Sequence, residues 1–398
     1  MNLKRGRLIA HAGLCAAALT LGGMVAGGGA VSAAASVHNG TGASAAISSS
    51  ELASLKTIVT HAEAPPKWFA PGPSVSYKVL KGKKIVTFPL SSEVDSCNVQ
   101  QKDFARAADA LGANVVSLAV SPPGGPQSWA ANLGEASSQG AAAVAMLCGI
   151  VPATVTGSLT ELHAHGIPVV DSGYNGVSSY AGLQAETAND VAGGVRDDLA
   201  DALVNLKGKA AHILLLDSPS VAQYQSVKTG LAADIKQWCP ATCKTYEDDI
   251  EVQDWANDAS SVLSYLNAHR DINTIIAAYG AMTFDLINGV KTAAATHPGL
   301  KLYTWGAGKG DESEVESSPI FVGDSGPDER WEAYNVLDEI IRLLSHKPAA
   351  PVQKESTPNV LFTKANVRSY FKGGAWSDAP YGGTAFIKDF YRLWGVSK

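Results

Sequence analysis

Short apolar segments alternate with longer amphipathic ones from residue 83 to about residue 347. The intervening segments, such as 103–112 and 258–271, place apolar residues at helical spacing. This alternation predicts an α/β fold built on parallel sheets with helices on both faces. Because such sheets bind ligands beyond the carboxyl ends of their strands, candidate functional residues should directly follow each apolar segment. The apolar segments, read as strands, are 83–90, 113–120, 141–149, 167–173, 211–219, 246–252, 273–280, 300–308 and 319–326.

The amino-terminal segment has the pattern of a secretory signal peptide. A basic start, KRGR, precedes a continuous apolar run over 8–31, and small residues follow that run. This order is typical of a secretory leader, with cleavage after Ala33 or Ala35. We therefore predict a signal peptide over 1–35 and an extracytoplasmic protein, either secreted, periplasmic or on the cell surface.

Two alternatives for this segment remain. A transmembrane anchor is disfavoured because glycine is dense in the apolar run and His11 interrupts it. Lipid attachment at Cys15 stays open, although Ala12 and Leu14 depart from the residues usual in a lipidation motif.

Charge and length limit the possible partners. The net charge of −6 becomes more negative once the basic leader is removed. A mildly acidic secreted protein is a poor candidate for binding nucleic acid or an anionic membrane. The remaining chain is long enough for two lobes. Residues 36–76, rich in Ser, Ala and Gly and then in Pro, predict a flexible extension in which 49–62 forms a short helix.

Four cysteines remain after the leader, an even number in an oxidising compartment. Cys239 and Cys243 stand close together in a loop, which favours a local bridge. Cys97 follows the first strand and Cys148 ends the third, and these strand ends are neighbours in the common doubly wound order. We predict the bridges Cys97–Cys148 and Cys239–Cys243. Four free buried thiols are the alternative. A metal site is disfavoured because CxxxC stands alone, without a second ligand pair.

Several segments in the correct order resemble the type I periplasmic binding proteins of ABC importers. The sequence is most similar to the ribose/galactose-type sugar-binding group, which has a lac-repressor-like core. RAADALGANVVSLAV (106–120), SSQGAAAVAML (137–147) and LTELHAHGIPVV (159–170) resemble the first half of that family. NTIIAAYGAMTFDLINGVKTA (273–293) resembles its second half. TPNVLFTKANV and FYRLWGV, near the end, resemble the returning strand and tail of actinobacterial-type members.

The resemblance implies two doubly wound lobes joined by three crossing segments, near 180–187, 321–326 and 359–365. It also implies a monomer that closes on a small solute by hinge motion and presents it to an ABC permease in the membrane, without a cofactor. The amino-terminal lobe is expected to hold 77–180 plus 327–347. The carboxy-terminal lobe is expected to hold 181–326 plus 348–398.

Candidate ligand-binding residues follow the predicted strands. Several are short polar groups suited to bonding with hydroxyls. By the resemblance, Gln225 stands at a ligand-binding Arg position of the family and Tyr279 at an Asn position. Trp305 lies beside the place of an aromatic–Asp pair, which Gly306 and Ala307 replace here. The complete predicted set is Ser91, Ser92, Asp95, Asp171, Ser172, Tyr224, Gln225, Tyr279, Trp305, Asp324 and Ser325.

These residue types favour a neutral sugar or polyol, since few basic residues stand at the strand ends. A small aromatic metabolite is the alternative solute, and a sensor without a transporter is an alternative role. A secreted hydrolase is the competing enzymatic hypothesis. The GDSG sequence at 323–326 is similar to the nucleophile motif of trypsin-like proteases, but those are all-β and their histidine motif is missing here. We therefore predict a binding protein and no catalytic residue.

Overall fold

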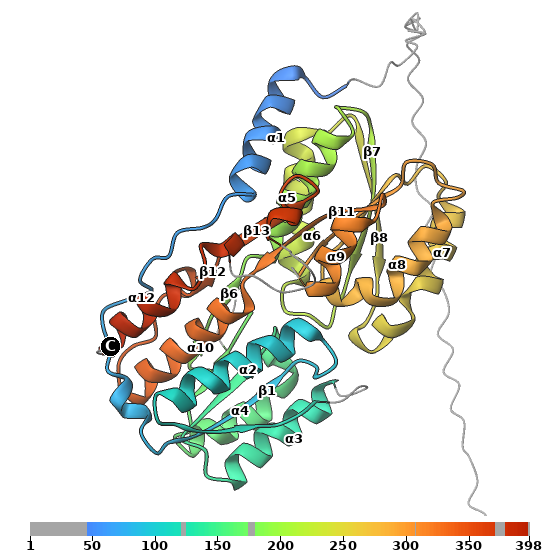
Figure 1. Cartoon of the computed structure of the whole chain (residues 1–398). Helices are drawn as coiled ribbons and strands as arrows, with labels where there is room; N and C mark the ends of the chain where they lie inside the picture. Colours follow the sequence, from blue (N-terminus) through green and yellow to red (C-terminus); the bar gives the residue numbers. More distant parts are fainter. Residues whose placement is uncertain (1–45, 121–124, 174–179, 307, 371–378, 397–398) are drawn as a thin grey trace, which may run out of the picture. The chain divides into compact units, whose positions relative to one another are not determined.

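The structure, a computed structural model, describes residues 46–120, 125–173, 180–306, 308–370 and 379–396. The predicted signal peptide and Cys15 lie outside the described residues. The described residues lie in one compact unit. Within it lie two separate larger sheets, each covered by helices (Figure 1). The predicted α/β fold class is therefore confirmed.

The first sheet has the strand order β2-β1-β3-β4-β5, and all its strand pairs are parallel. Its side chains alternate between two cores: Ile85 faces one, while Val86 and Phe88 face the other. Helices α2 (Asp95–Ala110), α3 (Gly125–Ser138) and α4 (Thr156–Ala164) connect its strands. The strands are β1 (Lys84–Pro89), β2 (Asn114–Ser117), β3 (Ala143–Leu147), β4 (Val169–Asp171) and β5 (Ala185–Glu186).

The second sheet has the order β13-β11-β10-β9-β7-β8, and only β13 runs antiparallel to its neighbour. Its strands are β7 (Ala211–Asp217), β8 (Cys243–Asp249), β9 (Thr274–Ala277), β10 (Lys301–Trp305), β11 (Phe321–Pro327) and β13 (Asn359–Thr363). The helices of this half are α5 (Val191–Asn205), α6 (Tyr224–Trp238), α7 (Asp258–Ala268), α8 (Thr283–Ala293), α9 (Lys309–Ser317) and α11 (Val367–Tyr370). Strand β8 lies earlier than the apolar run 246–252 predicted, because this edge strand is largely exposed and its pattern is polar.

Three chain segments cross between the halves, the number predicted, but two lie beside the predicted places, because 321–326 and 359–363 are strands of the second sheet. The first leaves β5 through β6 (Ala188–Asn189) into α5, and the second leads from β11 into α10 (Glu329–Leu344). The third returns from α10 through β12 (Ser356–Thr357) to β13, and β12 pairs with β6. Helix α10 itself packs on α2 and on β3 and β4, in the first half.

The carboxy-terminal helix α12 (Ala385–Leu393) corrects the predicted lobe boundary. We expected 348–398 to belong wholly to the second lobe, but α12 packs in the first half. Its apolar residues recur at helical spacing and meet aromatic residues of α10. Phe386 stacks on Trp331 with ring centroids 5.0 Å apart, and Trp394 stacks on Tyr334 at 5.6 Å.

Residues 46–76, part of the flexible extension predicted over 36–76, are packed against both halves, whereas 36–45 lie outside the described residues. Helix α1 (Ser49–Ala62) matches the predicted helix and begins at a capping box formed by Ser48 and Glu51. Its Leu55 is buried in the core of the second sheet. Trp68 then packs edge-on against Phe390 of α12, in the first half. This strap, residues 46–80, therefore adds another connection between the halves.

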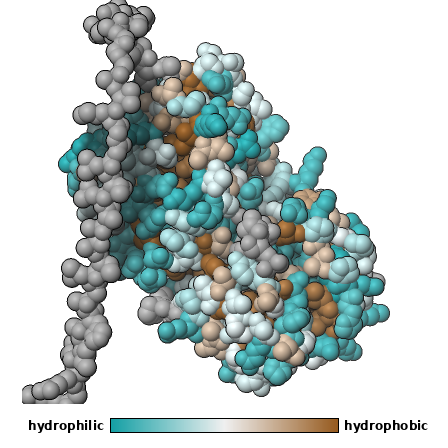
Figure 2. All heavy atoms as spheres, turned by 180° about the vertical axis from the view of Figure 1, so that it is seen from behind, coloured by the Kyte–Doolittle hydropathy of each residue, from teal (hydrophilic) through white to brown (hydrophobic). Residues whose placement is uncertain are grey.

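No helix in the described part of the chain is long and apolar enough to cross a membrane. Figure 2 shows hydrophilic and hydrophobic residues intermixed on the face opposite to that of Figure 1.

Candidate functional site at the carboxyl ends of the two sheets

The two halves touch at the carboxyl ends of their strands. Gln223, which follows β7, lies against the turns that follow β3 and β4. A Cβ atom added to Gly173 would lie 3.3 Å from Nε2 of Gln223, and one added to Gly149 would lie 3.5 Å from its Oε1. Val221 approaches Gly149 from the same side. The strand ends of both sheets therefore converge on one region, where α/β sheets bind ligands.

On the second sheet, a carboxylate and an aromatic pair occupy adjacent strand ends. Asp217 ends β7 and is 1 % exposed. Burial raises the pKa of Asp217 to about 7, against the lowering effect of the Ser218 backbone N–H, which donates to it at 2.7 Å. Tyr279, after β9, lies beside this carboxyl group. The pKa of Tyr279 is raised well above its usual value, mainly by burial and secondly by the negative charge of Asp217. The Tyr279 ring stacks on Trp255 at 5.8 Å.

The following strand ends continue this polar edge. Thr283, at the start of α8, donates a hydrogen bond of 2.6 Å to Asp311 of α9. Burial raises the pKa of Asp311 to about 7, and the Thr283 hydroxyl opposes that shift. Asp311 lies so close to Gly280 that a Cβ there would be 2.7 Å from its Oδ2. Glycine at 280 therefore allows the carboxylate to reach the backbone after β9.

On the first sheet, Asp171 and Ser172 end β4 and are fully buried. The Ser172 hydroxyl accepts hydrogen bonds of 2.8 Å from Gln100 and from the backbone N–H of Cys148. Glu332 of α10 completes this network and accepts a hydrogen bond of 2.8 Å from Asn189 of β6. The network therefore joins the β4 end to a crossing segment.

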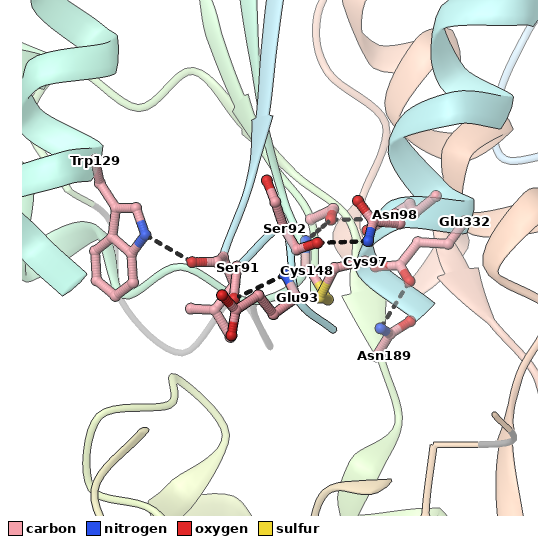
Figure 3. Close-up of a disulfide and its surroundings, with 12 residues drawn as sticks. Ser91, Ser92, Glu93, Cys97, Asn98, Trp129, Cys148, Asn189 and Glu332 are labelled. Atoms are coloured by element: carbon pink, nitrogen blue, oxygen red, sulfur yellow. Dashed lines mark hydrogen bonds between the residues drawn. A yellow bond between two sulfur atoms is a disulfide. The ribbon is translucent and has the colours of Figure 1, made fainter. Parts of the chain in front are cut away.

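Figure 3 shows the Asn189–Glu332 hydrogen bond of this network and the Cys97–Cys148 disulfide, with Ser91 and Ser92 nearby. Both predicted bridges are present: Cys97–Cys148 ties the start of α2 to the end of β3, and Cys239–Cys243 closes the turn before β8. The Ser92 hydroxyl accepts a hydrogen bond of 2.9 Å from Val120 N, so Ser92 braces the turn after β1.

The predicted residues at the other strand ends serve different roles. The Ser91 hydroxyl accepts a bond from the Glu93 N–H, and Asp95 is exposed in the first turn of α2. Tyr224 donates a 2.6 Å hydrogen bond to Asp249 at the edge strand β8. Gln225 is exposed, whereas its neighbour Gln223 faces the other half.

Trp305, Asp324 and Ser325 are buried in the second half. The Trp305 indole donates a 3.0 Å hydrogen bond to Asn359 and packs on Gly194 of α5. The Ser325 hydroxyl donates at 3.2 Å to Asp198, which is also fully buried. A serine held in this way between β11 and α5 is not accessible as a nucleophile, which weighs against the hydrolase hypothesis.

Sequence reasoning missed Asp217, Gln223 and Trp255. Asp217 stands near the end of the apolar segment 211–219, so the strand-end rule that selected Asp171 could also have selected Asp217. Gln223 was not selected because the family resemblance places the ligand-binding position at Gln225, two residues later. Trp255 lies in a 3-10 segment, Val252–Asn257, and no periodicity marks it.

Several buried polar atoms at these strand ends have no hydrogen-bond partner among the described residues. They are both carboxylate oxygens of Asp171, the hydroxyl of Ser218 and Oε1 of Gln223. Burial, followed by repulsion from Glu186 and Glu332, raises the pKa of Asp171 well above its usual value. Buried polar groups are normally hydrogen-bonded, so these atoms are suited to a ligand that brings donors and acceptors.

Other candidate sites in the described residues are weaker. A depression of about 340 Å³ lies between α1 and α5, away from the strand ends, and His61 and Arg196 are among its lining residues. Within the described ranges, no group of three or more His, Cys, Asp or Glu side chains is arranged to hold a metal ion.

Comparisons with known proteins support the fold. No family model matches the chain, and no curated protein matches its sequence. Solved structures of sugar-transport proteins do match along nearly their whole length. A sugar ABC transporter protein from Yersinia enterocolitica is similar with a TM-score of 0.65 and 17% identity, over 83% of this chain and 98% of that one. The chain has the type I periplasmic binding protein fold.

Two further structures with this fold have polyols bound. The myo-inositol-binding protein of Caulobacter, in complex with myo-inositol, matches with a TM-score of 0.62 and 16% identity, over 75% of this chain and 97% of that one. A solute-binding protein of Mycobacterium smegmatis with bound glycerol matches with a TM-score of 0.62 and 15% identity, over 73% and 96%. The resemblance to actinobacterial-type members stays a prediction.

Proposed function

We propose that this protein is an extracytoplasmic solute-binding protein that captures a small neutral sugar or polyol at the facing strand ends of its two lobes. The observation that carries this proposal is the set of buried, unpartnered polar atoms at those ends, on Asp171, Ser218 and Gln223. A hydroxylated solute offers donors and acceptors to such atoms at once. The neighbours with bound glycerol and myo-inositol hold ligands of this chemical type.

The second lobe supplies the two features that suit a sugar ring. Asp217 is a hydrogen-bond acceptor for hydroxyl groups when it is ionised. The stacked pair of Tyr279 and Trp255 would offer the C–H face of a sugar the apolar ring surface that the two rings do not cover on each other. Asp217, Tyr279 and Trp255 are already buried in this structure, so the solute would enter when hinge motion opens the cleft.

The charges near the site argue against an anionic solute. Lys228 of α6 donates a 2.9 Å hydrogen bond to Tyr224, and its charge is paired with Glu247 at 2.5 Å and Asp249 at 3.6 Å. Asp217 and Asp311 would repel an anion whenever they are ionised. Delivery to an ABC permease follows from the neighbours' family and is part of this proposal.

A ligand screen tests the proposal. Thermal-shift measurements with a panel of sugars, polyols and small aromatic metabolites would select candidates, and isothermal titration would give their affinities. We expect saturable binding of a sugar or polyol, with no conversion of the solute when it is followed by NMR. Turnover of the solute would favour a hydrolase, and selective binding of an aromatic metabolite would replace the sugar assignment.

A matched pair of variants locates the site. Asp217→Asn should weaken binding about ten- to hundredfold, equivalent to about 1.4–3 kcal/mol, because a buried acceptor is lost. Asp95→Asn, at an exposed position in the first turn of α2, should leave affinity unchanged. Equal effects of the two substitutions would place the solute elsewhere.

A further inference from the structure

The contact between Gln223 and the first lobe is built in a particular way. The Gln223 side chain is 3 % exposed, although it stands at the start of α6 where a polar residue commonly caps the helix. It makes no capping hydrogen bond there. Its amide lies instead against the backbone after β3 and β4. The local helix therefore does not explain the position of this side chain.

The surface that receives the Gln223 amide is formed by two glycines with left-handed backbone conformations. Gly149 has φ +81° and Gly173 has φ +83°, values that L side chains rarely adopt. A Cβ on Gly173 would also lie 3.1 Å from the Gly149 nitrogen and 3.3 Å from Nε2 of Gln223. A side chain at Gly173 would crowd the Gln223 amide, whereas a Cβ on Gly149 would make ordinary contact with it, at 3.5 Å. We call this surface, Gly149 and Gly173, the glycine notch.

The notch is held firmly within the first lobe. The Gly149 N–H donates a 2.7 Å hydrogen bond to the Ser172 carbonyl, which joins the two turns directly. Cys148, next to Gly149, is bridged to Cys97. The notch is thus a fixed surface, and motion of the lobes relative to each other would separate it from Gln223.

We propose that Gln223 and the glycine notch form a latch between the lobes, a positioning contact that stabilises the closed cleft. The amide lies against the two glycines of the notch, and Val221 lies close to Gly149. The latch acts on solute affinity through the closed state, because a ligand that binds that state benefits from any interaction favouring it. This effect on affinity rests on the proposed function, whereas the latch itself does not.

Distances between spin labels on the two lobes test the latch. Labels at Glu135→Cys on α3 and Gln253→Cys after β8 stand at exposed positions of different lobes. Double electron–electron resonance on the full chain, without solute, should show a closed component that decreases in Gln223→Ala. Gln223→Met, which restores the length of the side chain, should recover part of it. Gln237→Ala, at an exposed position near the end of the same helix, should match the parent.

The outcomes separate the latch from the function. An unchanged distance distribution in Gln223→Ala, including the case where neither protein shows a closed component, overturns the latch. Circular dichroism melts check that the variants are folded. If the distribution changes while no sugar or polyol binds the parent, the latch stands and the proposed function fails. If a solute binds, Gln223→Ala should lower its affinity several-fold while Gln237→Ala does not.

Discussion

At the scale of single residues, strand-end positions were predictable but the directions of side chains were not. Trp305 was expected in the cleft because it ends a strand, yet its indole packs on Gly194 and donates a hydrogen bond to Asn359. The space that receives its indole exists because α5 carries glycine at that point, and α5 is more than one hundred residues earlier in the sequence. Such long-range complementarity is not encoded in a local pattern.

The tryptophans therefore offer a residue-scale prediction. The chain contains 8 tryptophans, and Trp255 is the one stacked on Tyr279 beside Asp217. Solute binding should change intrinsic fluorescence, because closure alters the surroundings of this aromatic pair. We expect Trp255→Phe to remove most of the change and Trp305→Phe to retain it. Fluorescence titrations that give the reverse pattern would move the solute toward β10.

At the scale of elements, the strand order and the bridges were accessible from sequence because both follow from the doubly wound topology. Cys97 and Cys148 are 51 positions apart, yet the order β1-β3 makes their strand ends neighbours. Helix α12 was assigned to the wrong half because its apolar stripe indicates only that the helix packs against another element. Its aromatic partners on α10 determine which half that is. The edge strand β8 was misplaced because exposure removes its apolar pattern.

The two bridges should differ in their contribution to stability. In the chain-entropy view, a bridge that closes a longer loop restricts the unfolded chain more. With separations of 51 and 4, replacing both cysteines of Cys97–Cys148 by alanine should cost about 4 kcal/mol, and replacing those of Cys239–Cys243 about 2 kcal/mol. Urea unfolding of the two double variants measures this. A larger loss from the short loop would contradict the argument.

Alanine substitutions at two helix glycines should change the stability of the protein in opposite directions. A Cβ on Gly194 of α5 would lie 2.1 Å from Cδ1 of Trp305, so Gly194→Ala should destabilise by about 1–3 kcal/mol through overpacking. Gly134 of α3 has no atom within 4 Å of such a Cβ, so Gly134→Ala should stabilise by about 0.5–1 kcal/mol through helix propensity. Denaturant midpoints compare them directly. If Gly194→Ala instead stabilised the protein and Gly134→Ala destabilised it, Trp305 would not pack on α5.

At the scale of the whole molecule, many buried carboxyl groups link stability to pH. Burial raises the pKa of Asp197, Asp201, Asp217 and Asp258 to about 7. Burial also raises the pKa of Glu332 to about 7, opposed by its hydrogen bonds to Asn189, Ser172 and Gln100. Between about pH 4 and pH 7 the folded chain therefore binds more protons than the unfolded chain. The free energy of unfolding should fall as the pH rises through this window.

Denaturant unfolding at a series of pH values checks this sign. Each proton that only the folded state holds contributes about 1.4 kcal/mol per pH unit. Glu332→Gln removes one such group while leaving an amide for the network, so it should flatten the dependence by up to that amount. Stability that instead rises from pH 5 to pH 8 would show that these carboxyl groups are ionised in the folded protein.

The central claim is that the facing strand ends hold a neutral sugar or polyol, and native mass spectrometry of the gently purified protein tests it most directly. The account predicts an adduct with the mass of a neutral monosaccharide or polyol, retained in Asp95→Asn and lost or much reduced in Asp217→Asn. A parent protein that shows no adduct, even after incubation with a broad panel of sugars and polyols, would contradict it. So would an adduct that persists undiminished in Asp217→Asn.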